Sequence, residues 1–142
     1  MDFERTSLGE VLAKSSLDPG ARTFSSLLGV TQYLTKESID ATLRFVSSTP
    51  KGSEMVMEFI LPPDSWTPEE KGYLTQVVQR VAEMAEPWLT YFTPEEISEQ
   101  LSLLGFSGVS HLTPEDATAR YFAKRSDELR PPHYVRLLRA FV

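Results

Sequence analysis

The sequence predicts an α/β fold in a single domain, in which short apolar strands alternate with amphipathic helices. Residues 54–61, EMVMEFIL, are apolar on both faces of an extended chain, as in a strand buried within a parallel sheet. Three segments begin with threonine, proline and an acidic residue, at Thr67, Thr93 and Thr113, which is typical of a helix amino terminus. Alternating strands and helices favour parallel strands joined by right-handed crossovers.

Each further element has its own signal. A short helix is expected around Leu8, Val11 and Leu12, before a turn at Asp18-Pro19-Gly20. The final strand is long and apolar on both faces, which predicts an interior position in the sheet. Strands are expected over residues 23–28, 54–61, 106–112 and 134–142, and helices over residues 36–48, 68–84, 94–104 and 114–124.

Composition narrows the function classes. The 142 residues fit one domain, residues 1–142, and 41% hydrophobic with 24% charged residues is typical of a globular chain with a sizeable core. The net charge of −6 argues against nucleic acid and anionic membranes as partners. The absence of cysteine excludes disulfides, zinc thiolates and thiol nucleophiles. No apolar run reaches the ~20 residues of a membrane span, and the first residues show no signal-peptide pattern, so the expected location is the cytoplasm.

Common catalytic and binding motifs are absent. The chain has no G-x-G-x-x-G, P-loop, H-E-x-x-H or G-x-S-x-G sequence, and its acids show no metal-site spacing, so no metal is predicted. His111 and His133 stand alone, which is more typical of packing or surface residues than of a base. The acids after Thr67, Thr93 and Thr113 are interpreted as helix caps rather than catalytic carboxylates.

Residues 22–34 read as a strand, a turn containing Gly29 and the start of a helix. In an open α/β sheet, ligands bind just beyond the carboxyl ends of the strands, where this turn would lie. Glycine there can adopt φ > 0 or let a ligand approach the backbone closely. Spacing alone favours the alternative, that Gly29 only lets the chain leave the strand.

Aromatic residues gather in the middle of the chain. They could line an apolar substrate pocket, although filling the core is the favoured interpretation. The set comprises Trp66, Tyr73, Trp88, Tyr91 and Phe92.

Several stretches together resemble a known family and occur in its order. They are DFERTSLGEVL near the start, residues 16–59, residues 86–125, and LRPPHYVRLLRAFV at the end. The chain resembles the carboxyl-terminal half of the leucine carboxyl methyltransferase-like family, which are class I S-adenosylmethionine-dependent methyltransferases and often O-methyltransferases of polyketide biosynthesis.

The resemblance implies a three-layer, Rossmann-like sheet of seven strands. Residues 23–28, 54–61 and 106–112 would be strands four, five and six, and residues 134–142 strand seven, antiparallel between two others. The pair Asp2-Phe3 matches the family's contact to the adenine end of the cofactor. The turn Leu28-Gly29-Val30 stands where the family often has an acid, and Tyr33-Leu34 matches the family's Tyr-Leu pair. The expected cofactor-binding residues are therefore Asp2, Phe3, Leu28, Gly29 and Val30.

The family's glycine-rich first strand–turn–helix, and its ribose-holding acid, have no counterpart in this sequence. The chain is therefore expected to be half of a methyltransferase, from a truncated or degenerate gene or a separately made second half, that uses S-adenosylmethionine only in the complete domain. Tyr33, Tyr91 and His133 are the candidates to orient or deprotonate a hydroxyl or carboxylate of a small-molecule acceptor. The alternative is a non-catalytic α/β module that binds a protein partner or forms a homo-oligomer through an exposed edge of the strand over residues 23–28.

Overall fold

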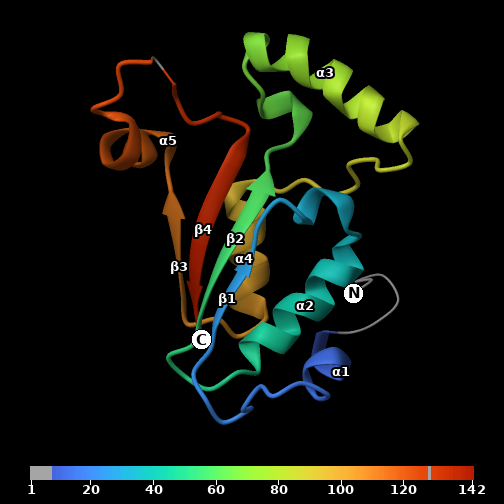
Figure 1. Cartoon of the computed structure of the whole chain (residues 1–142), viewed down its shortest axis with the longest axis vertical. Coiled ribbons are helices and arrows are strands. Elements are labelled where there is room, and N and C mark those ends of the chain that lie inside the picture. Colours follow the sequence, from blue (N-terminus) through green and yellow to red (C-terminus); the bar gives the residue numbers. More distant parts are fainter. Residues whose placement is uncertain (1–7, 128) are drawn as a thin grey trace.

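The computed structural model describes residues 8–127 and 129–142 (Figure 1). Within these residues, four strands and five α-helices follow one another in nearly the expected order, with short 3₁₀ turns at residues 31–33 and 63–65. The elements are α1 Leu8–Leu12, β1 Phe24–Leu27, α2 Lys36–Ser47, β2 Glu54–Ile60, α3 Pro68–Glu83, α4 Pro94–Leu103, β3 Gly108–Leu112, α5 Pro114–Ala117 and β4 Val135–Phe141.

The strands form one mixed sheet in the order β1-β2-β4-β3. β1 runs parallel to β2, with Phe24 opposite Glu54, while β4 runs antiparallel to both β2 and β3. The parallel direction expected for β4 from strand–helix alternation is therefore wrong. The cause is visible in Figure 1: α5 lies beyond the end of β3 and does not cross the sheet, so the chain re-enters at the edge that it has just left. The interior place of β4 and its antiparallel direction, which the resemblance implies, are confirmed.

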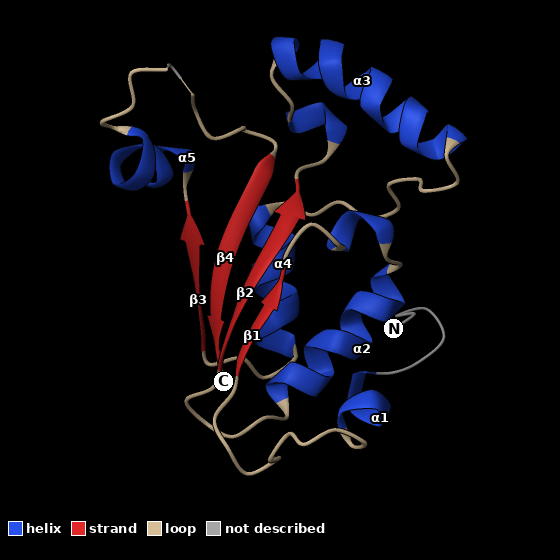
Figure 2. Ribbon diagram, in the orientation of Figure 1, coloured by secondary structure: helices blue, strands red, loops and turns tan. Residues whose placement is uncertain are grey.

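One face of the sheet is covered by helices and holds the core. Met55, Met57 and Phe59 of β2 are at most 1% exposed and belong to one cluster with buried side chains of α2 and α4. The helical partners are Ile39, Leu43 and Val46 from α2 and Ile97 and Leu101 from α4. Figure 2 shows α4 behind the strands on this side. The residues alternate as a pleated strand requires, so the other side chains of β2 point to the opposite face.

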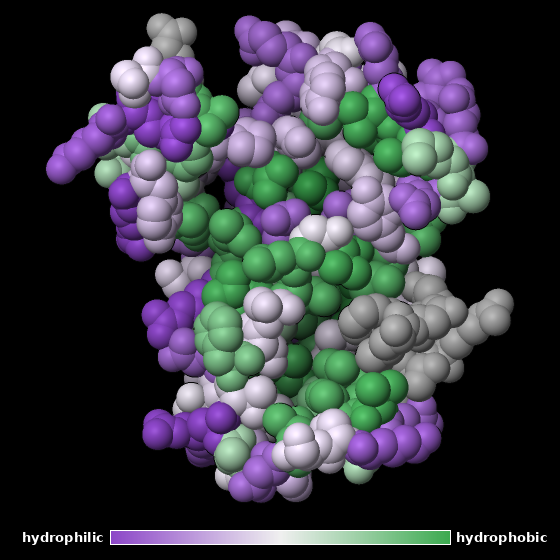
Figure 3. Space-filling view, in the orientation of Figure 1, coloured by the Kyte–Doolittle hydropathy of each residue, from purple (hydrophilic) through white to green (hydrophobic). Residues whose placement is uncertain are grey.

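The opposite face is apolar but open among the described residues. Phe24 of β1 is 65% exposed and Leu28 49% exposed, and Figure 3 shows an apolar surface across the middle of the molecule, over the strands. A bidentate ion pair between Arg139 and Glu54, with N–O distances of 2.7 and 2.9 Å, also lies on this face. The described residues thus supply two of the three expected layers, a sheet and the helices on one side of it.

Two elements differ from the sequence-based expectation. β3 begins at Gly108 rather than residue 106. The helix expected over residues 114–124 is regular only to Ala117 and continues as a π-helical stretch, Thr118–Phe122. Among the described helices, none combines the length and the apolar character that crossing a bilayer requires.

Candidate functional site

The carboxyl ends of β1, β2 and β3 lie at one edge of the sheet, where β4 begins (Figure 1). Ligands of open α/β sheets bind just outside this edge. Four connections border it: residues 28–34, 61–67, 84–93 and 131–134. The candidate site is built from these connections.

The first connection offers open backbone at the end of β1. Gly29 has φ = +67°, and a Cβ added there would meet nothing within 4 Å. Leu28 beside it is half-exposed, whereas Val30 packs against the core. The hydroxyl of Thr31 donates to the carbonyl of Glu58 at 2.9 Å and fixes the turn to β2. An exposed apolar side chain beside bare backbone fits one wall of a site for a flat group such as adenine, but residues 28–34 carry no carboxylate for a ribose.

Tyr33 lies at the end of this connection, in the 3₁₀ turn whose N–H groups bond back to Val30 and Thr31. Its half-buried side chain borders a shallow hollow of about 490 Å³, together with residues of the connection after α3. The carbonyl of Gln32 accepts from the N–H of Leu89 at 2.6 Å, which holds the two connections together. Tyr33 is thus placed at a surface hollow beside the connection after α3.

An aromatic cluster, Trp66, Trp88 and Tyr91, lies beside these connections. The ring centroid of Tyr91 is 6.4 Å from each tryptophan ring. The indole N–H of Trp66 donates to the carbonyl of Leu61 at 2.8 Å, whereas that of Trp88 is buried without a partner among the described residues. Burial raises the pKa of Tyr91 above its ordinary value. Its phenol therefore stays protonated at neutral pH and is suited to donate a hydrogen bond, not to act as a base.

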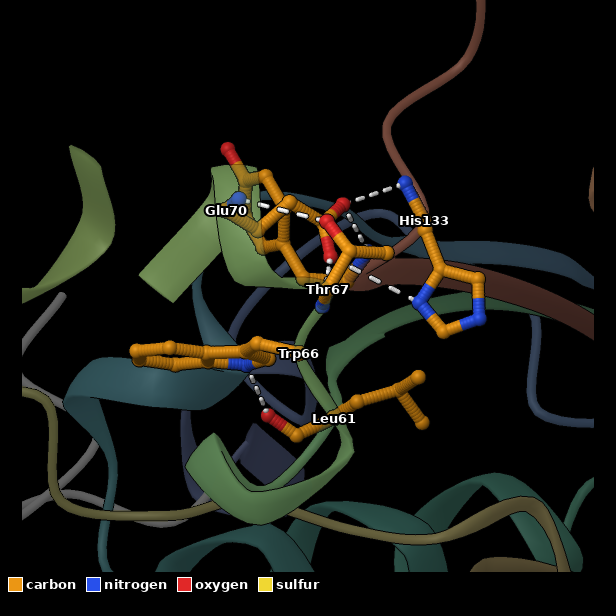
Figure 4. A network of polar contacts seen from close by, with 6 residues as sticks. Leu61, Trp66, Thr67, Glu70 and His133 are labelled. Atoms are coloured by element: carbon orange, nitrogen blue, oxygen red, sulfur yellow. Dashed lines mark hydrogen bonds and ion pairs between the residues drawn. The ribbon is translucent and has the colours of Figure 1, made fainter. Parts of the chain in front are cut away.

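The fourth connection carries His133, which meets the first turn of α3 (Figure 4). One carboxylate oxygen of Glu70 accepts from the backbone N–H of His133 at 2.7 Å and from that of Tyr134 at 3.0 Å. The other accepts from the N–H of Thr67 at 3.0 Å and lies 3.6 Å from Nδ1 of His133. In Figure 4 the second ring nitrogen of His133, Nε2, points away from the carboxylate.

The structure brings some of the candidate residues together and leaves others apart. Tyr33 and Tyr91 both flank the connection after α3, whereas His133 forms a separate group with Glu70. Asp2 and Phe3 lie outside the described residues. Nothing in the described residues gathers three or more side chains able to hold a metal ion.

Sequence reasoning missed the wider role of Glu70. The capping box at Thr67 predicts its bond to the helix start, and that bond is present. Its contacts to the start of β4 join residues 63 and 64 positions apart, for which no local pattern exists. Only the order of strands could have suggested that the first turn of α3 and the start of β4 share an edge.

Comparison with known proteins shows which families the chain is similar to. Residues 1–47 match the family model for leucine carboxyl methyltransferase. The Bacillus subtilis (strain 168) protein YktD, named as an S-adenosyl-L-methionine-dependent methyltransferase, is 33% identical over 136 residues. That alignment covers 91% of this chain but 42% of YktD, so the chain spans less than half the length of this relative.

Solved structures share the fold at low sequence identity. A DUF574-family protein from Streptomyces avermitilis has a TM-score of 0.61 and 17% identity, with 94% of this chain matching 50% of that one. Human N-acetylserotonin methyltransferase, in complex with S-adenosylmethionine, has a TM-score of 0.52 and 15% identity, with 99% of this chain matching 32% of it. The chain is therefore similar to the leucine carboxyl methyltransferase family over residues 1–47 and to an S-adenosylmethionine-dependent methyltransferase over most of its length, and its fold matches the carboxyl-terminal part of Rossmann-like methyltransferase folds.

Proposed function

We propose that this chain is the carboxyl-terminal half of an O-methyltransferase, which transfers a methyl group to a hydroxyl or carboxylate oxygen of a small molecule. The observation that carries the proposal is the edge of the sheet, which is bordered by an open turn at Gly29, by Tyr33 and Tyr91, and by a separate group of His133 and Glu70. Bound S-adenosylmethionine would supply an activated methyl group, so the protein's task is mainly to position the acceptor.

The proposed roles follow from what each residue offers. Leu28, Gly29 and Val30 would form one wall of the cofactor site, and Asp2 and Phe3, which the resemblance to the family implies, would add to it. Three more residues would meet the acceptor. Tyr33 and Tyr91 would orient it by donating hydrogen bonds, and His133 would take its proton.

The acceptor class rests on the resemblance of the sequence to the family. Of the aromatic cluster, Trp66 is 7% exposed and belongs to the core, and Trp88 and Tyr91 are partly buried against it. The accessible parts of Trp88 and Tyr91 could still pack against a flat acceptor. An aromatic hydroxyl compound of the polyketide type has this shape and carries the oxygen that the reaction needs.

The cofactor site would be complete only together with the part of the relatives that this chain does not match. YktD extends over more than twice the matched length, and the described residues offer one wall without a ribose-binding carboxylate. We therefore expect the chain alone to bind S-adenosylmethionine weakly or not at all.

Calorimetric titration can test this on two proteins: the chain alone, and the chain joined behind the part of YktD that precedes the matched region. Micromolar binding of S-adenosylmethionine by the joined protein only is the expected result. Micromolar binding by the chain alone would contradict the half-site. A joined protein that shows cooperative thermal unfolding but no binding would contradict the methyltransferase assignment for this half.

A second candidate function is favoured by one observation, the free edge of β1. Among the described residues no strand pairs with the outer edge of β1, and the neighbouring face exposes Phe24 and Leu28. Such an edge can pair with another copy of the chain. In this alternative the chain is a self-associating module without catalysis. Sedimentation at micromolar concentration would show a dimer, and a clean monomer would remove the candidate.

A further inference from the structure

Glu70 joins two segments that are far apart in sequence. It is the third residue of α3, and its carboxylate also contacts the start of β4. The side chain of Glu70 is 15% exposed, whereas that of His133 is 44% exposed. A carboxylate that only capped its helix would need neither the contact to His133 nor this degree of burial.

We propose that Glu70 is a positioning residue for His133: it keeps the proton on Nδ1, so that Nε2 faces the acceptor as the base. This inference rests on the proposed O-methyltransferase function and names the group that prepares its base. Glu70 itself does not touch the acceptor and acts only through the imidazole.

The position of the carboxylate is fixed by its other bonds. It accepts from three backbone N–H groups, those of Thr67, His133 and Tyr134, at 2.7 to 3.0 Å. It also lies in the first turn of α3, at the positive end of the helix dipole. The oxygen that faces the imidazole therefore has little freedom to move.

The protonation of the ring follows from this contact. Nδ1 of His133 is buried and has no hydrogen-bond partner, and the nearest charged atom is Oε2 of Glu70 at 3.6 Å. An ionised carboxylate only accepts, so a lone pair on Nδ1 would face a negative oxygen, whereas an N–H there is attracted to it. A small rotation of the ring closes the gap to hydrogen-bond distance.

This tautomer suits the proposed reaction. With the proton on Nδ1, the lone pair of the imidazole is on Nε2, which points away from the Glu70 carboxylate (Figure 4). The acceptor oxygen would bond to the methyl carbon of S-adenosylmethionine as the carbon–sulfur bond breaks and the sulfur keeps the electron pair. The hydroxyl proton would move to Nε2, which leaves the imidazole with a proton on each ring nitrogen.

Nitrogen NMR of the 142-residue chain, with histidine side chains labelled, tests the inference without activity. The two ring nitrogens report directly which of them carries the proton in the neutral form. We expect Nδ1–H for His133. In Glu70→Gln, the amide can keep an acceptor toward the backbone but turns an NH₂ group toward Nδ1, so the major form should change to Nε2–H.

Glu96→Gln is the matched control. Glu96 completes the same capping box at the start of α4, accepting from the N–H of Thr93 at 2.8 Å, and it has no histidine neighbour in that box. This variant should lose a comparable cap and leave the His133 signals unchanged. A wild-type chain with Nε2–H as its major form would overturn the inference even if Glu70→Gln failed to fold. So would a folded Glu70→Gln chain with unchanged His133 signals.

Discussion

The two histidines show how differently one residue type can be used. Both stand alone in the sequence, but His111 lies on the covered face of β3, where its Nε2 is 2.8 Å from the hydroxyl of Ser98. Its ring meets the edge of Phe59 at a centroid distance of 6.1 Å. His111 is thus a packing residue, as its isolation in the sequence suggests. His133, which has the same sequence signal, contacts a carboxylate and exposes a ring nitrogen.

His111 should make stability depend on pH. Burial lowers its pKa below the ordinary 6.5; a nearby Glu95 opposes this and Arg136 adds to it. The unfolded chain therefore takes up the proton first as the pH falls. The stability that neutral His111 contributes is present in full above 6.5 and is lost as the pH drops through the lowered pKa.

Replacing His111 by Gln removes this titration while keeping a polar group near Ser98. We expect the free energy of unfolding, from urea titrations at pH 7.5 and pH 5, to fall less in His111→Gln than in the wild type. Equal falls in the two proteins would mean that other groups carry the acid sensitivity.

At the scale of elements, the sequence predicts where helices begin better than where they end. All three Thr-Pro-acid segments start helices at the proline, and each threonine hydroxyl accepts from the N–H three residues on. These starts are predictable because the cap is a local interaction of four residues. The end of α5 was not predictable, because nothing local stops the pattern at Ala117 and the chain continues in a π-helical stretch.

The caps should differ in their effect on stability. α4 carries Ile97 and Leu101, both 0% exposed, so loss of its cap is coupled to the core. We expect Thr93→Ala to lower the free energy of unfolding by about 1 kcal/mol. Thr113→Ala should lower the free energy of unfolding clearly less, because α5 has only four residues and can unfold locally while the sheet stays folded. Chemical denaturation of both variants measures this, and an equal or larger loss for Thr113→Ala would show that α5 is part of the cooperative core.

At the scale of the whole molecule, the order and direction of the strands could not be predicted from local sequence patterns. Periodicity identifies four strands but does not give their directions, and β4 runs against the expectation from alternation. Only the family resemblance gives the antiparallel β4. The same limit applies to the site, since the turn at Gly29 is readable from local sequence but the contact between Glu70 and His133 depends on the return of β4 to the edge beside α3.

Within the described part of the chain, no strand pairs with the outer edge of β1, and this has a consequence that can be tested. α1 packs on α2 and not on this edge, and a Cβ added at Gly9 would lie 3.2 Å from the ring of Phe45. The N–H of Glu54 donates to the carbonyl of Thr23, and Ser25 lies opposite Met55. Residues of a parallel strand bond alternately to the two sides, so the N–H of Ser26 points to the outer edge.

Ser26→Pro should therefore remove an edge donor without removing a bond to β2, because proline is tolerated on edge strands where the N–H faces outward. If the chain self-associates through this edge, sedimentation should show a dimer for the wild type and a folded monomer for Ser26→Pro. Ser25→Pro, one position earlier, removes an N–H that faces β2 and should lower the unfolding temperature instead. If folded Ser26→Pro is still a dimer, the dimer interface does not lie at the edge of β1. Phe24→Ser would then test whether the interface lies on the exposed apolar face of the sheet.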